Sequence, residues 1–221
     1  MYGVVILIVY KMLTSLMRVA MFVFAKWDVS GVEYIPETQG YVLVSNHVHI
    51  MDPPLLGASS PGRILRPMAK QELFSLPLVG WIFSAYGAYS VKRNGRDLRA
   101  LRESLRLISA GEAILLFIEG TRSRGGPLQI GHGGAALIAL KSGRPVIPVS
   151  IQGSNVKFPH VFFKWIVRRR PHIIVHFGPP VDLQGIEANS TGVREATDRI
   201  MFAIADLLPV DLRGPYDRSV G

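Results

Sequence analysis

The sequence predicts an α/β protein with a mostly parallel central sheet flanked by helices, preceded by an apolar membrane-associating helix or helix pair. Short apolar runs alternate with longer stretches of helical periodicity, which is the pattern of a sheet covered by helices. The 221 residues contain no repeat or linker and suit one domain with a full core. We therefore expect a membrane-associating segment at 1–28, a globular domain at 29–210 and a loosely ordered tail at 211–221.

The strands are predicted from apolar runs that are too short for buried helices and that end at turn residues. In chain order they cover residues 32–35, 41–46, 63–69, 89–91, 113–118, 145–151 and 172–177. Helices are expected between them, beginning with one that Asp52 caps and Pro53 opens. The others are a stretch after residue 69 interrupted at Pro77, and helices at 97–109, 134–142 and 195–208.

The apolar N-terminus, residues 2–25, carries two cations, Lys11 and Arg18. Seven positions on a helix return to within about 20° of one direction, so Lys11, Thr14, Ser15 and Arg18 form one polar stripe. Two cations inside a membrane-spanning helix cost roughly 2.5–3.5 kcal/mol each. A helix or bent helix pair lying in the interface avoids this cost. A tilted span with the stripe packed on the domain, and a buried core helix, are the alternatives.

Composition favours an anionic membrane surface as a partner. The net charge is +9 and hydrophobic residues make up 48% of the chain, so apolar surface accompanies the positive charge. Cysteine is absent, which excludes disulfides, a thiol nucleophile and cysteine metal ligands. The histidines show no zinc-ligand spacing, and we expect no metal.

Residues 157–170 interleave aromatic side chains with five cations. Such a segment could stack on single-stranded nucleic acid or sit in the lipid headgroup region. Beside an apolar N-terminal helix the second interpretation is favoured, so we expect no nucleic-acid partner. The residues expected to meet the membrane, besides Lys11 and Arg18, are Phe162, Phe163, Trp165, Arg168, Arg169 and Arg170.

A histidine and an aspartate follow the strand at 41–46. His47 directly follows that strand, where open α/β sheets bind ligands, and Asp52 lies five residues later. On one helix the two side chains would lie about 500° apart and on different faces, but across a strand-to-helix turn they can meet. An Asp carboxylate on one imidazole nitrogen makes the other nitrogen a general base at neutral pH. The alternative is that Asp52 is only a cap and His47 a polar turn residue.

Cations follow two further strands. Lys92 and Arg93 come after residues 89–91, and Arg122 comes after residues 113–118. The ends of neighbouring strands converge on one crevice, and arginine forks match phosphate oxygens. The alternative is a solvated basic rim in which Glu119 forms a salt bridge.

Four segments resemble, in order, the signature blocks of the glycerolipid acyltransferase family, which includes the 1-acylglycerol-3-phosphate acyltransferases. They are His47-x-x-x-x-Asp52, Gly87-Ala88-Tyr89-Ser90-Val91-Lys92-Arg93, Phe117-Ile118-Glu119-Gly120-Thr121-Arg122-Ser123 and Val146-Ile147-Pro148-Val149. The matched span, residues 41–151, is about half of the chain. The chain departs from the family pattern at Ile118, where proline is usual, which affects loop geometry rather than chemistry.

The resemblance implies an acyltransferase domain at residues 29–210. It would move a fatty acyl group from an acyl thioester, carried by coenzyme A or acyl carrier protein, to the free sn-2 hydroxyl of 1-acylglycerol 3-phosphate (lysophosphatidic acid). The product would be phosphatidic acid. His47 would act as general base and Asp52 would orient it, with no acyl-enzyme and no cofactor.

In the family that the chain resembles, the second and third blocks bind the glycerol phosphate of the acceptor. This role falls on Lys92, Arg93, Glu119, Gly120, Thr121 and Arg122. By its charge Glu119 is a poor phosphate ligand, so we expect it to hold an acceptor hydroxyl or an arginine. The acyl chain is expected in an apolar groove lined by parts of residues 73–86.

Two other functions remain open. One is transfer to glycerol 3-phosphate or another lysophospholipid, and the other is a non-catalytic protein that binds anionic lipid. In each case we expect membrane association, at the cytoplasmic face of the cell membrane.

Overall fold

A computed structural model describes residues 2–92, 97–155 and 170–218 of the chain. The centre of the fold is a seven-stranded sheet with strand order β1-β7-β6-β2-β5-β3-β4. Its strands are β1 (Lys26–Ser30), β2 (Tyr41–Ser45), β3 (Leu65–Lys70), β4 (Tyr89–Val91), β5 (Ala113–Phe117), β6 (Val146–Gln152) and β7 (His172–Phe177). All paired strands run parallel except β6 and β7, which are antiparallel.

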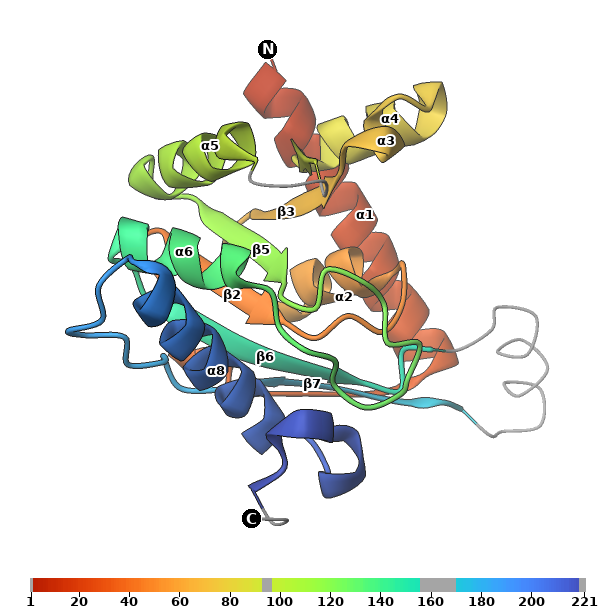
Figure 1. Ribbon diagram of the computed structural model, residues 1–221. Coiled ribbons are helices and arrows are strands. Elements are labelled where there is room, and N and C mark those ends of the chain that lie inside the picture. The colour runs from red at the N-terminus through yellow and green to blue at the C-terminus, as the bar shows by residue number, and fades with distance from the viewer. Residues whose placement is uncertain (1, 93–96, 156–169, 219–221) are drawn as a thin grey trace.

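Helices cover both faces of the sheet (Figure 1). They are α1 (Tyr2–Phe24), α2 (Asp52–Ser59), α3 (Gln71–Phe74), α4 (Pro77–Tyr86), α5 (Leu98–Ser109), α6 (Gly133–Ser142) and α8 (Ser190–Asp206). Helices α5, α6 and α8 pack on one face, and α1 and α2 pack on the other. The expected α/β architecture, with its N-terminal apolar helix, is confirmed.

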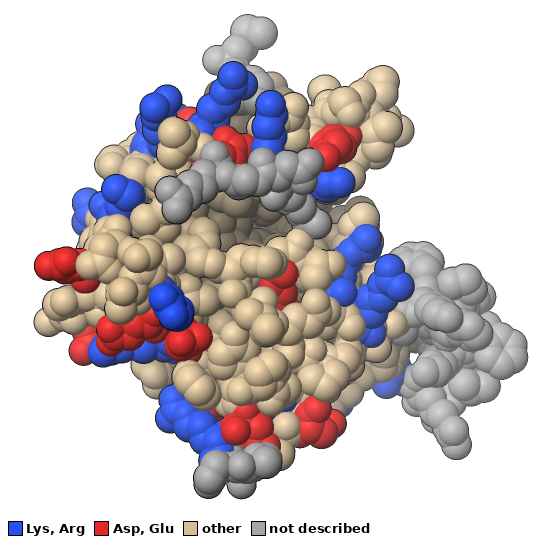
Figure 2. Space-filling model, in the orientation of Figure 1, with Lys and Arg blue, Asp and Glu red and all other residues tan. Residues whose placement is uncertain are grey.

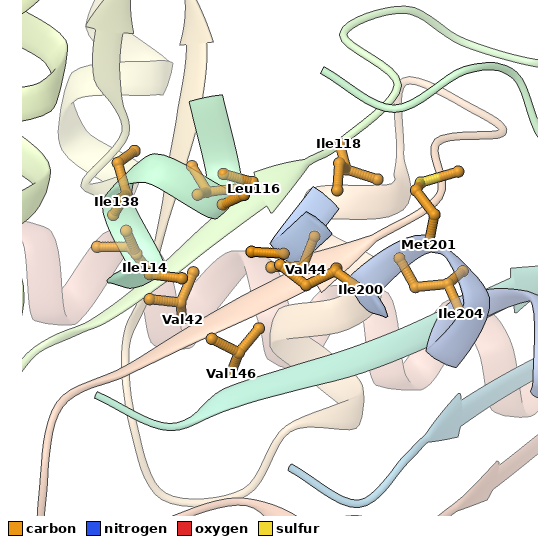
Figure 3. Packing of buried hydrophobic residues seen from close by; sticks show 14 of the residues in the cluster. Val42, Val44, Ile114, Leu116, Ile118, Ile138, Val146, Ile200, Met201 and Ile204 are labelled. Carbon is orange, nitrogen blue, oxygen red and sulfur yellow. The ribbon is translucent and has the colours of Figure 1, made fainter. Parts of the chain in front are cut away.

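The central strands are buried on both faces, which explains why they read as continuous apolar runs. In β2, Val42 and Val44 face α6 and α8, where they meet Ile138 and Ile200 in one core (Figure 3). Leu43 points to the opposite face, into the core shared with α1 and α2. Every residue of β2 is buried, so this strand and the loop after it have a rigid support.

The N-terminal edge of the sheet differs from the prediction. Residues 32–35, predicted as a strand, contain a 3-10 helix, Val32–Tyr34, and the strand is Lys26–Ser30 instead. The strand ends at Gly31, whose φ of 75° suits glycine; a Cβ there would lie 1.9 Å from the Phe177 carbonyl oxygen. The chain therefore turns closely over β7 and cannot continue as a strand.

The C-terminal part also differs. Helix α8 begins at Ser190 rather than 195, because the Asn189 side chain accepts a hydrogen bond from the Gly192 amide and caps it. Beyond α8, where a loosely ordered tail is expected, Val210–Leu212 and Gly214–Tyr216 form 3-10 helices. Tyr216 is buried and its hydroxyl accepts a hydrogen bond from the Gly131 amide.

The N-terminal segment is one continuous helix, α1, rather than a helix pair. The predicted polar stripe is divided between the protein and the outside. Thr14 is buried, and the Arg18 Nε donates to the Ala58 carbonyl of α2 at 2.9 Å, whereas Lys11 is exposed. Residues Gly3–Phe24 are long and apolar enough to cross a membrane by length and composition.

Helices α1, α2 and α4 meet around Gly57. A Cβ at this position would lie 2.4 Å from the Tyr86 hydroxyl and 2.8 Å from the Tyr10 hydroxyl. The rings of Tyr10 and Tyr86 pack on each other with centroids 4.8 Å apart. Only glycine leaves room for this approach, so the three helices form one packed unit.

Candidate active site

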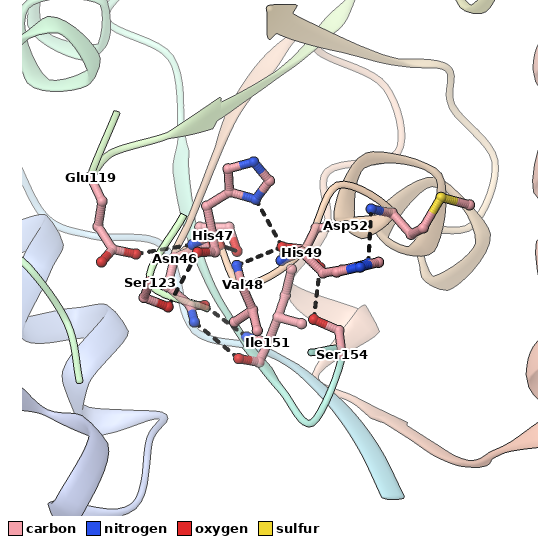
Figure 4. A network of polar contacts seen from close by, with 11 residues as sticks. Asn46, His47, Val48, His49, Asp52, Glu119, Ser123, Ile151 and Ser154 are labelled. Carbon is pink, nitrogen blue, oxygen red and sulfur yellow. Dashed lines mark hydrogen bonds and ion pairs between the residues drawn. The ribbon is translucent and has the colours of Figure 1, made fainter. Parts of the chain in front are cut away.

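The centre of the site is a contact between His47 and Asp52. His47 lies just beyond the carboxyl end of β2, and its Nδ1 is 2.8 Å from Asp52 Oδ2 (Figure 4). The same carboxylate oxygen accepts the backbone amides of Val48 and His49, each at 2.7 Å. The Asp52 side chain is fully buried, so its negative charge depends on these donors for stabilisation.

Asp52 does not cap α2 as predicted. It is the first residue of the helix, and Met51 occupies the N-cap position. Its carboxylate turns back onto the preceding loop, where it binds the imidazole and two amides rather than the first turn of α2. The helix start therefore serves to place a carboxylate beneath the imidazole.

The other Asp52 oxygen has a partner that the sequence does not reveal. The Ser154 hydroxyl, in the loop after β6, donates to Asp52 Oδ1 at 2.8 Å, and Ser154 is buried (Figure 4). With both oxygens bound, the carboxylate cannot rotate away from His47. Ser154 follows the fourth sequence block by several residues and has no recognisable spacing to Asp52.

The imidazole of His47 is held in place by packing as well. Its ring stacks on Phe117, the last residue of β5, with centroids 3.9 Å apart and an interplanar angle of 18°. Because Nδ1 faces Asp52, Nε2 is the nitrogen left for a substrate, and the side chain is 16% exposed. A general base requires an imidazole held in this way, with one nitrogen bound to a carboxylate and the other able to accept a proton.

The backbone of His47 is bound on both sides by the third sequence block. Its amide donates to Glu119 Oε1 at 3.0 Å, and its carbonyl accepts the Ser123 amide at 2.7 Å. The neighbouring Asn46 uses its side-chain amide to bind both the N–H and the C=O of Ile151 in β6. The loop that carries His47 is thus attached to β5 and β6, the two strands that flank β2.

Glu119 has different partners from those expected. It is 1% exposed, and its second oxygen accepts the Gln129 amide at 2.9 Å. Burial raises the pKa of Glu119, while the hydrogen bonds from the Gln129 and His47 amides oppose that rise. Among the described residues, backbone amides therefore take the place of the arginine partner, and Glu119 holds the His47 loop in position.

The residues predicted for phosphate binding lie at different distances from this centre. Thr121 and Arg122 are exposed in the loop after β5, the strand beside β2, whereas Arg93 lies outside the described residues. Lys92 is exposed at the end of β4, three strands from β2, which corresponds to about 14 Å. In Figure 2, Lys and Arg side chains lie on both sides of a hollow in this face.

Gly120 makes a close approach in the third block. Its φ is +64°, and a Cβ there would lie 2.8 Å from Cδ2 of His132. The glycine identity is therefore required by both the backbone conformation and the neighbouring ring. This allows the loop carrying Thr121 and Arg122 to turn directly after Glu119.

The residues predicted to meet the membrane are only partly described. Arg170 lies at the C-terminal end of α1, where its Nη1 donates to the Phe22 carbonyl at 3.4 Å. Arg18 contacts α2, as noted above, and Lys11 is exposed. The predictions for Phe162, Phe163, Trp165, Arg168 and Arg169 fall outside the described residues.

The family profile for Acyltransferase matches residues 26–152, which include β1 to β6 and all of the contacts between His47 and Asp52. This chain belongs to the acyltransferase family. The crystal structure of the 1-acyl-sn-glycerophosphate acyltransferase PlsC from Thermotoga maritima has the same fold, with a TM-score of 0.68 and 27% identity. The superposition covers 90% of this acyltransferase and 78% of that chain.

The names of the curated relatives refer to two different acyl acceptors. A chloroplastic 1-acyl-sn-glycerol-3-phosphate acyltransferase of Brassica napus is 29% identical over 78% of this chain and 51% of its own. A Borreliella burgdorferi enzyme of the same name is 29% identical over 70% of this chain and 61% of its own. A lyso-ornithine lipid O-acyltransferase of Pseudomonas aeruginosa is 36% identical over 51% of this chain and 43% of its own. The acyltransferase thus spans about half the length of these relatives.

Proposed function

We propose that this protein transfers a fatty acyl group from an acyl thioester to the sn-2 hydroxyl of 1-acylglycerol 3-phosphate, forming phosphatidic acid. The observation that carries the proposal is the His47–Asp52 pair at the end of β2, in which Nδ1 is bound to the carboxylate and the His47 side chain is partly exposed. Membership of the acyltransferase family and the names of the relatives support it.

In the proposed mechanism His47 acts as general base. Nε2 removes the hydroxyl proton as the substrate oxygen attacks the thioester carbonyl, and Asp52 stabilises the imidazolium that forms. The tetrahedral intermediate then collapses, the carbon–sulfur bond breaks, and the imidazolium returns its proton to the departing thiolate. The products are an ester and a free thiol, and no acyl-enzyme is formed. Phe117 and Ser154 are positioning residues in this scheme.

The acceptor phosphate is assigned to cations around the hollow. Arg122 and Thr121 follow β5 next to His47, and Lys92 and Arg93 follow β4. Arginine forks bind phosphate oxygens in a bidentate geometry. Glu119 and Gly120 shape this loop, so their contribution to acceptor binding is to position it.

A different lysolipid acceptor is the second candidate. The relative from Pseudomonas aeruginosa is named for lyso-ornithine lipid rather than for a glycerol phosphate, and it is 36% identical to this chain. Glycerol 3-phosphate is a third acceptor for the same chemistry. All three share the base and differ in the groups that recognise the acceptor.

The protein is proposed to work at a membrane, on the cytoplasmic face. Helix α1 supports this proposal, because much of its outer side is apolar and exposed. Phe22, at 80% exposure, and Leu16, at 63%, are examples. A lipid acceptor held in one leaflet requires an enzyme that binds to that leaflet.

The test is acyl transfer by detergent-purified protein, with acyl-coenzyme A and acyl carrier protein thioesters as donors. Lysophosphatidic acid, lyso-ornithine lipid and glycerol 3-phosphate are offered separately as acceptors. We expect phosphatidic acid from the first, and a loss of about 10²–10⁴ in rate for His47→Ala. Circular dichroism checks that the variant is folded.

Activity on another acceptor alone would keep the mechanism and replace the substrate. If the wild-type protein transferred no acyl group in any combination, yet bound anionic lipid, the non-catalytic lipid-binding function would be the correct one.

A further inference from the structure

We propose that α4 is a second membrane-contacting element, which inserts Leu78 and Trp81 into the same lipid leaflet that α1 contacts. The inference rests on the proposed function only in naming the lipid that is processed there.

Large apolar side chains are exposed along the 76–82 segment. Leu78 is 70% exposed, Trp81 is 59% exposed and Leu76 is 50% exposed. Leu78, Trp81 and Ile82 are spaced i, i+3 and i+4, so they share one side of α4. Parts of residues 73–86 are predicted to line an apolar groove, and these three side chains lie on the surface of the protein.

The inner side of α4 is already occupied. Gly80 packs against the Phe74 backbone of α3, and the rings of Phe74 and Phe83 meet edge to face at 6.0 Å. Tyr86 packs on Tyr10 of α1. The outward direction of Leu78 and Trp81 therefore follows from close packing on the other side, and a rotation of α4 that buries them would break these contacts.

Charge distinguishes this surface from that of an ordinary solvated helix. Residues 73–91 contain no charged side chain, whereas a surface helix in water usually carries charges on its outer side. Lys92 directly follows the stretch, Glu72 directly precedes it and pairs with Lys70 at 3.3 Å, and the chain as a whole carries a charge of +9. An uncharged apolar patch with tryptophan, on a protein of strongly positive net charge, fits the headgroup boundary of an anionic leaflet.

Helix α4 also connects this surface to the site. The Tyr86 hydroxyl, at its C-terminal end, donates to the carbonyl of Pro53 at 3.2 Å, and Pro53 directly follows Asp52. From Leu78 to Tyr86 the helix rises about 12 Å. A lipid whose chain lies beside Leu78 is therefore about the length of α4 from the turn that carries His47 and Asp52. Helix α4 thus sets the distance between the leaflet and His47.

Tryptophan fluorescence tests the insertion directly. The chain has three tryptophans, so Trp27→Phe with Trp165→Phe leaves Trp81 as the single probe. We expect its emission to shift to the blue on anionic vesicles and to be quenched by bromines placed at a shallow depth in the acyl chains. Because the chain has no cysteine, Leu78→Cys carrying an environment-sensitive dye provides a second probe if the tryptophan variant does not fold.

A matched pair of variants tests the energetic contribution. Leu78→Asp places a charge on α4, and Leu98→Asp does the same at a 56%-exposed leucine on α5. We expect Leu78→Asp to weaken vesicle binding about tenfold and Leu98→Asp to leave it unchanged. Activity of Leu78→Asp should fall on vesicle-embedded lysophosphatidic acid and persist on a water-soluble short-chain analogue.

The proposal is overturned if the protein binds vesicles while Trp81 and the Leu78→Cys dye both report water, or if the two aspartate variants bind vesicles equally well. A face that stays in water would instead be free to meet another protein. Failure of the proposed function gives a different pattern, with no transfer to the soluble analogue by wild type while the fluorescence signals on vesicles persist.

Discussion

The contribution of Ser154 is open to a quantitative test. Its hydroxyl donates to the buried Asp52 carboxylate at 2.8 Å. Ser59, also buried, donates at the same distance of 2.8 Å to the neutral Leu55 carbonyl within α2. Hydrogen bonds to charged groups contribute about 1.5–3 kcal/mol and those between neutral groups about 0.5–1.5 kcal/mol. Ser154→Ala should therefore lower the free energy of unfolding by about 1.5–3 kcal/mol, and Ser59→Ala by about 0.5–1.5 kcal/mol, in urea denaturation.

Kinetics separate a positioning role from a purely structural one. Without Ser154 only the three donors to Oδ2 hold the Asp52 carboxylate, so the carboxylate orients the imidazole less strictly. We expect kcat of Ser154→Ala to fall about tenfold, which is about 1.4 kcal/mol, with KM unchanged. Ser154→Thr keeps a hydroxyl and should restore kcat, while Ser59→Ala should leave kcat at the wild-type value. Equal stability losses for the two alanine variants, or an unchanged kcat for Ser154→Ala, would refute this reasoning.

Three further predictions concern the third sequence block. Phe117→Leu removes an aromatic stack worth about 0.5–1.5 kcal/mol, so kcat should fall up to about tenfold in steady-state assays while the fold persists. Burial raises the pKa of Glu119 in the folded state, so its contribution to stability is complete below the unfolded pKa and is lost as pH rises through the folded pKa. In urea denaturation at a series of pH values, the free energy of unfolding of the wild type should fall relative to that of Glu119→Gln as pH rises. If the two free energies change with pH in parallel, the raised pKa of Glu119 is contradicted. Gly120→Ala should lower the free energy of unfolding by about 1–2 kcal/mol because of the positive φ, and by a further amount because the new Cβ clashes with His132. Gly111→Ala, at a φ of +80° with nothing within 4 Å of the new Cβ, should show only the loss that is due to φ.

The predictable parts of the fold are those whose signal is local. The buried strands β2, β5 and β6 read as apolar runs because both of their faces are covered. The edge strand β1 gives no such run, since Lys26, Asp28 and Ser30 are exposed in it. It is a strand because it pairs with β7 from the far end of the chain, and that partner cannot be recognised from its own five residues.

The site divides in the same way. His47 and Asp52 are close in sequence and flank a strand-to-helix turn, so their contact could be predicted. Ser154 reaches Asp52 across 102 residues, and its position depends on β6 lying beside β2. The sequence singles out Glu119 as a site residue but does not predict its partners. These are backbone amides, which every residue except proline has, so no residue type identifies them.

The absence of a side chain at Gly57 has a mechanical consequence. It lets α1 and α4 press directly on α2, the helix whose first residue is Asp52. Helix α1 and the element that carries Asp52 are therefore packed directly against each other. Under the proposed function, with α1 in lipid and His47 as the base, the tilt of α1 would fix the height of the imidazole above the leaflet that holds the acceptor hydroxyl. A bulkier residue at position 57 would alter that height without touching any group that does chemistry.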